Sequence, residues 1–165
     1  KEMFAAQRYF EQDSFNLALN GDGNYLGFID IADDYGLTKA GNLANYYSGV
    51  CYYKLGQFEK AIDYLQNFSS EDQLVGPIAI GCIGDSYMEL GKTEEAIKYY
   101  EKAALEKEND LTTALFFFKA GNAYEMLNKN DKSLEAYTKV KECKESPFAS
   151  EIEKYILRVQ LKAKK

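Results

Sequence analysis

Apolar side chains recur every three or four residues along most of this chain, which is the spacing of an amphipathic helix. No stretch shows the apolar–polar alternation of a half-buried strand, and the chain has only two prolines. The pattern therefore predicts an all-α protein. The expected helices cover residues 3–11, 15–19, 25–35, 38–55, 58–68, 77–90, 93–105, 112–127, 131–143 and 146–161.

Residue types at the predicted helix ends support these boundaries. Thr38 is suited to cap the helix that follows it, and Pro77 suits a first helical turn, where its missing N–H costs nothing. Gly56 and Gly91 follow the ends of two helices, where a left-handed backbone is favoured. The corresponding place after residue 127 holds Asn128, and asparagine tolerates this conformation next best after glycine. The same backbone turn is therefore expected three times.

The helices also repeat in pairs. The first helix of each pair carries a glycine and, three residues later, a tyrosine: Gly49 and Tyr52, Gly84 and Tyr87, Gly121 and Tyr124. Successive glycines are 84 − 49 = 35 and 121 − 84 = 37 residues apart. A nearly fixed period of this size is typical of stacked helical repeats.

This pattern resembles the tetratricopeptide repeat (TPR) family. The best-matching pair fills the family's small, aromatic and glycine positions with Gly84, Tyr87, Gly91, Ala96, Tyr100 and Ala103. The third pair departs from the family pattern at Asn128, Ser133 and Val140, and the first pair departs at Phe68. The resemblance implies a right-handed α-α superhelix of repeats at 42–75, 77–110 and 114–147. It also implies a degenerate N-terminal repeat at 1–36 and a capping helix at 148–163, all in one domain spanning 1–165.

The degenerate first repeat contains an insertion. Asp13 and Ser14 separate its two helices, and either residue is suited to cap the second helix. Asn, Gly and Asp at residues 20–24 predict a loop, because these residues tolerate positive φ. A calcium-binding reading of this loop fails because Leu26 and Asp33 stand where an oxygen ligand and a bidentate glutamate are needed.

Composition argues against most catalytic and metal sites. The chain has no histidine, and its three cysteines include no Cys-x-x-Cys pair, so a disulfide framework or zinc site is not expected. Adjacent carboxylates such as Glu94 and Glu95 point about 100° apart on a helix and do not converge on one substrate. We therefore expect no enzyme activity, no metal and no cofactor. The net charge of −6 disfavours nucleic acid as a partner.

In TPR proteins the first helix of each pair lines a concave groove, and the resemblance maps such a groove onto this chain. Its expected partner-binding residues are Tyr46, Val50, Tyr53, Lys54, Asp85, Met88, Glu89, Phe118, Asn122, Glu125 and Met126. Aromatic and methionine side chains are good anchors for a peptide or protein partner. The acidic residues favour a partner that carries Lys or Arg. The expected function is a non-enzymatic interaction or scaffolding module.

An alternative remains open from the sequence. The insertion or the terminal helices can cover the groove residues, since exposed apolar surface of this size needs a cover or a partner. The protein would then be a structural subunit with a self-filled groove, forming homo-oligomers in a cell-envelope assembly. The sequence leaves the oligomeric state open. The basic residues Arg158, Lys162, Lys164 and Lys165 lie near a helix C-terminus, where cations are favoured, and a short basic run of this kind can also contact phosphate or lipid headgroups.

A narrower resemblance concerns location. The chain resembles the repeat domain of Bacteroidota proteins that carry one membrane anchor upstream. It begins with Lys1 rather than methionine, which suggests a trimmed sequence, and it contains no apolar run long enough to cross a membrane. The resemblance implies a position on the periplasmic side of the inner membrane, held by an anchor outside this chain. A cytoplasmic location is the alternative.

Overall fold

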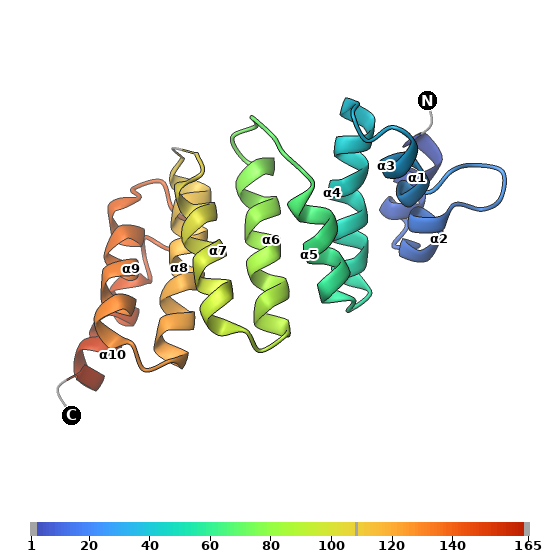
Figure 1. The fold of residues 1–165 in the computed structure, drawn as a ribbon. Helices are drawn as coiled ribbons and strands as arrows, with labels where there is room; N and C mark the ends of the chain where they lie inside the picture. The colour runs from blue at the N-terminus through green and yellow to red at the C-terminus, as the bar shows by residue number, and fades with distance from the viewer. Residues whose placement is uncertain (1–2, 108, 164–165) are drawn as a thin grey trace. The chain divides into compact units, whose positions relative to one another are not determined.

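The computed structural model describes residues 3–107 and 109–163, and within them it contains α-helices and no strand. The all-α fold predicted from the sequence is confirmed. The helices are α1 (Met3–Glu11), α2 (Phe15–Asn20), α3 (Phe28–Asp34), α4 (Lys39–Lys54), α5 (Phe58–Gln66), α6 (Val75–Glu89), α7 (Thr93–Leu105), α8 (Asp110–Met126), α9 (Asn130–Glu142) and α10 (Ile152–Ala163) (Figure 1). The chain forms two compact units, Lys1–Ser70 and Glu71–Lys165.

The first unit packs α1 to α5 around an aromatic centre. Tyr47 of α4 stacks on Phe28 of α3, with ring centroids 4.9 Å apart and planes 8° apart. Phe10 of α1 meets the same Tyr47 ring edge-on at 5.1 Å. In the α4–α5 hairpin, a Cβ on Gly49 would collide with the Leu65 side chain, so only glycine permits this approach of the two helices. The N-terminal helices therefore share one core with the first regular pair.

The insertion forms a loop between α2 and α3, as predicted. Gly21 and Gly23 adopt φ values of 74° and 87°, which side chains other than glycine rarely accept. The Asp22 carboxylate closes the turn by accepting the backbone N–H groups of Asn24 and Tyr25, each at 2.9 Å. The prediction that a side chain of Asp13 or Ser14 caps α2 is wrong for Ser14. Ser14 precedes α2, but its side chain caps no helical N–H and instead donates to the Gln12 carbonyl oxygen.

The second unit consists of the α6–α7 and α8–α9 hairpins followed by α10. Small residues again set the helix approach. A Cβ on Gly84 would lie 2.7 Å from two ring carbons of Tyr100, and one on Gly121 would collide with the ring of Tyr137. Both tyrosines are almost fully buried. The glycine positions recognised in the sequence are thus the contact points within each hairpin.

The predicted helix ends are largely confirmed. The Thr38 hydroxyl accepts the N–H of Gly41 at 3.2 Å and caps α4. Gly56, Gly91 and Asn128 have φ values of 72°, 70° and 56°, so asparagine does replace glycine at the third left-handed turn. Pro77 lies in the first turn of α6.

The last helix begins later than the sequence predicted. The prediction placed its start near Ser146, whereas α10 starts at Ile152 after a series of turns. The Ser146 hydroxyl accepts the N–H of Phe148 at 3.0 Å, and the Phe148 ring stacks on Phe118 of α8. This packing fixes the segment before helical geometry begins. The apolar stripe was predicted correctly, since Ile152 and Val159 are buried.

Candidate functional site

Two neighbouring helices of the second unit, α6 and α8, present parallel stripes of side chains. On α6, Ile78, Asp85 and Glu89 lie seven and four residues apart and therefore share one face. On α8, Leu111, Lys119 and Met126 lie eight and seven residues apart and therefore fall on one side of the helix. A salt bridge between Asp85 and Lys119 shows that the two stripes face each other. We call the surface formed by these stripes the α6/α8 face.

The centre of this face is an ion pair. The Lys119 ammonium lies 2.7 Å from both carboxylate oxygens of Asp85. The Tyr100 hydroxyl donates to the same carboxylate at 2.7 Å, and the Lys119 ammonium lies 5.6 Å from the centre of the Tyr100 ring. The side chains of Lys119 and Asp85 are 33% and 26% exposed. The pair is thus partly open to solvent and accessible to a partner's polar groups.

Apolar side chains stand at both ends of the α6/α8 face. Ile78 and Leu111, near the starts of the two helices, are 41% and 49% exposed. Met126, at the end of α8, is 65% exposed, and Glu89 at the end of α6 is exposed as well. Met88, which the sequence also placed in the groove, is half-buried against the core instead. The face therefore combines separated apolar anchors with a central charged pair.

The chain's own C-terminal segment covers another part of the predicted groove. The Phe118 ring stacks on Phe148, with centroids 4.6 Å apart and planes 12° apart, and meets Tyr155 edge-on at 4.9 Å. The amide oxygen of Asn122 accepts the Tyr137 hydroxyl at 2.7 Å. These two predicted site residues are engaged within the protein.

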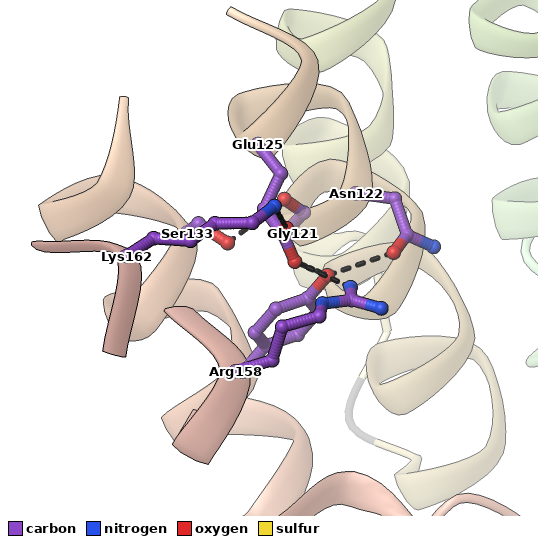
Figure 2. A network of polar contacts seen from close by, with 7 residues as sticks. Gly121, Asn122, Glu125, Ser133, Arg158 and Lys162 are labelled. Atoms are coloured by element: carbon purple, nitrogen blue, oxygen red, sulfur yellow. Dashed lines mark hydrogen bonds and ion pairs between the residues drawn. The ribbon is translucent and has the colours of Figure 1, made fainter. Parts of the chain in front are cut away.

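Glu125 is held by cations of α10. Figure 2 shows Arg158 and Lys162 reaching the Glu125 carboxylate from the neighbouring helix. Lys162 lies 2.7 Å from one carboxylate oxygen, Arg158 binds the other, and the Tyr137 hydroxyl donates to the Arg158-bound oxygen at 3.1 Å. The Glu125 side chain is only 9% exposed. Burial by itself raises the pKa of Glu125, but the bonds from Lys162, Arg158 and Tyr137 outweigh it and lower the pKa.

This arrangement gives two of the C-terminal cations a partner that the sequence did not indicate. The Arg158 and Lys162 side chains are 47% and 53% exposed, and both bind Glu125 of α8. Their charges are therefore used inside the protein. Two of the three predicted acidic groove residues, Asp85 and Glu125, already have cationic partners, and Glu89 remains the exposed acid of the set.

The remaining predicted residues belong to α4 in the first unit. Tyr46 packs against Tyr47 at 5.6 Å and against Phe68 at 5.1 Å. Tyr53 meets the Phe58 ring edge-on at 5.6 Å. Val50 is half-buried and Lys54 is exposed.

The sequence reasoning missed Lys119, the cation at the centre of the face. Lys119 follows Phe118 directly, and the family pattern assigns Phe118, but not Lys119, to the groove. The shared binding of Arg158 and Lys162 to Glu125 did have a signal in the sequence. The two cations are four residues apart, which places both on one face of α10.

Reactive chemistry is sparse in the described part of the chain. No group of three or more His, Cys, Asp or Glu residues within 3–107 and 109–163 is arranged to hold a metal ion. Burial raises the pKa of the Cys51 thiol to about 12, so this cysteine is a poor nucleophile at neutral pH. None of the helices described is long and apolar enough to cross a membrane.

Models of the tetratricopeptide repeat match residues 43–72 and 77–110 of the chain. These two segments are tetratricopeptide repeats. A TPR repeat-containing protein of Methanocaldococcus jannaschii, MJ1428, is 30% identical over 95 residues, which are 58% of this chain and 16% of that protein. The chain thus spans about a sixth of the length of this relative. The family recognised from the sequence is confirmed.

Solved structures show the same fold. A crystal structure of MamA protein aligns with a TM-score of 0.68 at 19% identity, covering 87% of this chain and 71% of that one. A second MamA structure aligns with a TM-score of 0.66 at 17% identity, covering 98% and 96%. PcrH, crystallised in complex with the chaperone binding region of PopB, aligns with a TM-score of 0.56 at 19% identity, covering 76% and 97%. At these identities the likeness concerns the fold alone.

Proposed function

We propose that this TPR chain is a protein-interaction module whose α6/α8 face holds a segment of a partner protein. One observation carries the proposal: Ile78, Leu111 and Met126 remain substantially exposed around a partly open ion pair. Interaction surfaces commonly combine exposed apolar side chains with polar groups that can hydrogen-bond to a partner. The proposed face keeps Asp85, Glu89 and Met126 of the groove predicted from the sequence and adds Ile78, Leu111 and Lys119 to it.

The exposed anchors supply the affinity in this proposal. Fully burying a side chain such as Met, Leu or Ile is worth about 1.5–3 kcal/mol, and each anchor here still has roughly half of that gain to make. Ordering the partner consumes part of this gain. A moderate affinity is the expected result, of the kind that suits exchangeable partners.

Charge sets the partner's character. Glu89 is exposed beside the end of α6 and suits a Lys or Arg of the partner. The Asp85–Lys119 pair in the centre can accept and donate hydrogen bonds to a partner backbone while staying intact. We therefore propose a partner segment that carries apolar residues and at least one cation.

Repeat domains of this kind serve as interaction scaffolds, and the proposed role involves no catalysis. PcrH supports the proposal because its structure was solved with a region of PopB bound. This chain shares its fold with PcrH, and we infer from that likeness that it also binds a segment of a partner protein.

A second candidate is a structural subunit that forms homo-oligomers. It is favoured by the cover over Phe118 and Glu125, since part of the predicted groove is filled by the chain's own C-terminal segment. Light scattering after size exclusion separates the two candidates. A stable dimer or larger species, unchanged when Ile78 and Met126 are replaced by serine, would favour the structural subunit.

Site-specific photo-crosslinking in cells tests the preferred function. A photoreactive phenylalanine analogue is placed at Met126 or at Ile78, and a matched control places it at Lys98 on α7, whose side chain is 72% exposed. The proposal expects the same partner band from Met126 and Ile78 and none from Lys98. Equal capture from all three positions would contradict it, because the α6/α8 face would then have no preference over α7.

A further inference from the structure

A cleft in the first unit is not used by the α6/α8 face. It lies between α1 and the loop that joins α2 to α3, the long loop drawn in blue in Figure 1. Its volume is about 390 Å³, near the lower end of the range for sites that bind small groups. Phe4, Ala5, Arg8, Tyr9, Gln12 and Tyr25 line it.

Two aromatic residues that line this cleft are largely exposed. Phe4 is 72% exposed and Tyr25 is 62% exposed, although both rings are large and apolar enough to favour burial. They come from different elements, Phe4 from α1 and Tyr25 from the loop. A flat apolar group between them would bury both rings and gain stacking contacts.

The loop is fixed in place by hydrogen bonds. The Tyr9 hydroxyl donates to the Asp22 carboxylate at 2.8 Å, and the same carboxylate accepts the N–H of Tyr25 at 2.9 Å. These bonds lower the pKa of Asp22, chiefly through the Tyr9 hydroxyl, and they raise the pKa of Tyr9. The carboxylate is thus used to close the loop, and Tyr25 is positioned before any ligand arrives.

Arg8 supplies the charge of the cleft. It is exposed, and it forms no salt bridge with any residue of 3–107 or 109–163. Gln12 follows the last residue of α1, four residues beyond Arg8, and lines the same cleft. A guanidinium donates two parallel hydrogen bonds to a carboxylate, and an amide side chain adds a third donor. The polar part of the cleft therefore matches a carboxylate.

We propose that this cleft binds the carboxyl-terminal residue of a peptide when that residue is aromatic. The carboxylate pairs with Arg8, and the side chain lies between Phe4 and Tyr25. Because both rings border solvent, the rest of the peptide leaves the cleft without crossing the protein. The site belongs to the first unit and does not depend on the α6/α8 face or on the function proposed for it.

Fluorescence anisotropy of short labelled peptides tests this assignment. The probes are a fluorescein-labelled peptide that ends in Gly-Gly-Phe with a free carboxylate, its carboxamide, and a free-acid version that ends in Ala. The free-acid phenylalanine peptide should bind saturably. The carboxamide and the alanine version should each bind at least about tenfold more weakly, since each lacks one of the two recognised groups.

Variants of the protein separate the contacts. Arg8→Gln should weaken binding of the free-acid peptide about tenfold or more and leave the weak binding of the carboxamide unchanged. Tyr25→Ala should weaken the phenylalanine peptide about threefold to tenfold. Both side chains are exposed, so circular dichroism should show unchanged folding. Lys98→Gln, an exposed cation on α7, is the matched control and should bind as the wild type does.

Four outcomes would overturn the assignment. Equal affinity for the free-acid and carboxamide peptides would show that the carboxylate is not recognised. Unchanged binding of the free-acid peptide by Arg8→Gln would show that Arg8 does not bind the carboxylate. N-acetylphenylalanine carries the same carboxylate and ring, so it should compete with the labelled peptide, and a failure to compete would show that the terminal residue is not what the cleft recognises. The absence of saturable binding to the wild type would reject the cleft as a site.

Discussion

Replacing Glu125 by glutamine tests the packing of α10 on α8. Glutamine keeps the size of glutamate and one oxygen acceptor, but it loses the charge that Arg158 and Lys162 bind. Hydrogen bonds to charged groups contribute about 1.5–3 kcal/mol. Breaking a fully buried ion pair costs about 3–5 kcal/mol because one charge is left buried and unpaired.

The smaller of these two ranges of free energy applies to the Glu125→Gln substitution. Its side chain is 9% exposed, whereas Arg158 and Lys162 are 47% and 53% exposed and can turn to water when their partner is removed. We therefore expect the free energy of unfolding to fall by about 1–3 kcal/mol. For a chain of this length, each kcal/mol lowers the melting temperature by about 2–4 °C.

The pH dependence gives this prediction a second readout. The folded state lowers the pKa of Glu125, so the ionised carboxylate stabilises the fold above its unfolded pKa of about 4.3. That contribution is lost as the pH falls through the lower folded value. The Glu125→Gln penalty should therefore be complete at pH 6–7 and shrink below about pH 4.

Urea unfolding followed by circular dichroism measures the effect. Glu151→Gln is the matched control, because Glu151 forms an exposed salt bridge with Lys154 at 2.6 Å, with side chains 59% and 60% exposed. This control should change the free energy of unfolding by less than about 0.5 kcal/mol. If Glu125→Gln and Glu151→Gln destabilise the protein equally, the reasoning about burial and shared cations is refuted.

Three further substitutions test the fold. Gly84→Leu should lower the free energy of unfolding by about 1–3 kcal/mol or more, because even its Cβ would lie 2.7 Å from the Tyr100 ring; chemical denaturation that shows no loss would contradict this close approach. Thr38→Ala should cost about 1 kcal/mol through loss of the cap on α4, and a melting temperature equal to the wild type would refute it. Asn128→Gly should be neutral or stabilise by up to about 1 kcal/mol in thermal unfolding, since glycine adopts the observed φ of 56° without strain; a clear destabilisation would show that the asparagine side chain has another role.

The fold was predictable because its signals are local. Glycines at Gly56 and Gly91 mark the turns, and the asparagine at residue 128 meets the same backbone requirement. The spacing of Gly49, Gly84 and Gly121 set the repeat. The start of α10 was missed because Phe148 packs on Phe118, a contact that no local pattern shows. The grouping of all repeats into one domain stays a prediction.

The candidate site was predictable only in part. The resemblance placed Asp85, Glu89 and Met126 on helices that do form a common face or border it. It did not show that Phe118 and Glu125 are covered by the chain's own C-terminal segment, because helical periodicity specifies the face of a helix and leaves its neighbour undefined. The sequence also shows that a residue is acidic without showing which cation pairs with it in the fold.

The measurement that tests the central claim most directly is the affinity of the photo-crosslinked partner for variants of the α6/α8 face. The double variant Ile78→Ser plus Met126→Ser removes two exposed anchors, and Lys98→Gln serves as the control. The account predicts that the double variant, still folded by circular dichroism, binds the partner about tenfold or more weakly, while Lys98→Gln binds as the wild type does. Equal affinity of the double variant and the wild type would contradict the claim that this face holds the partner.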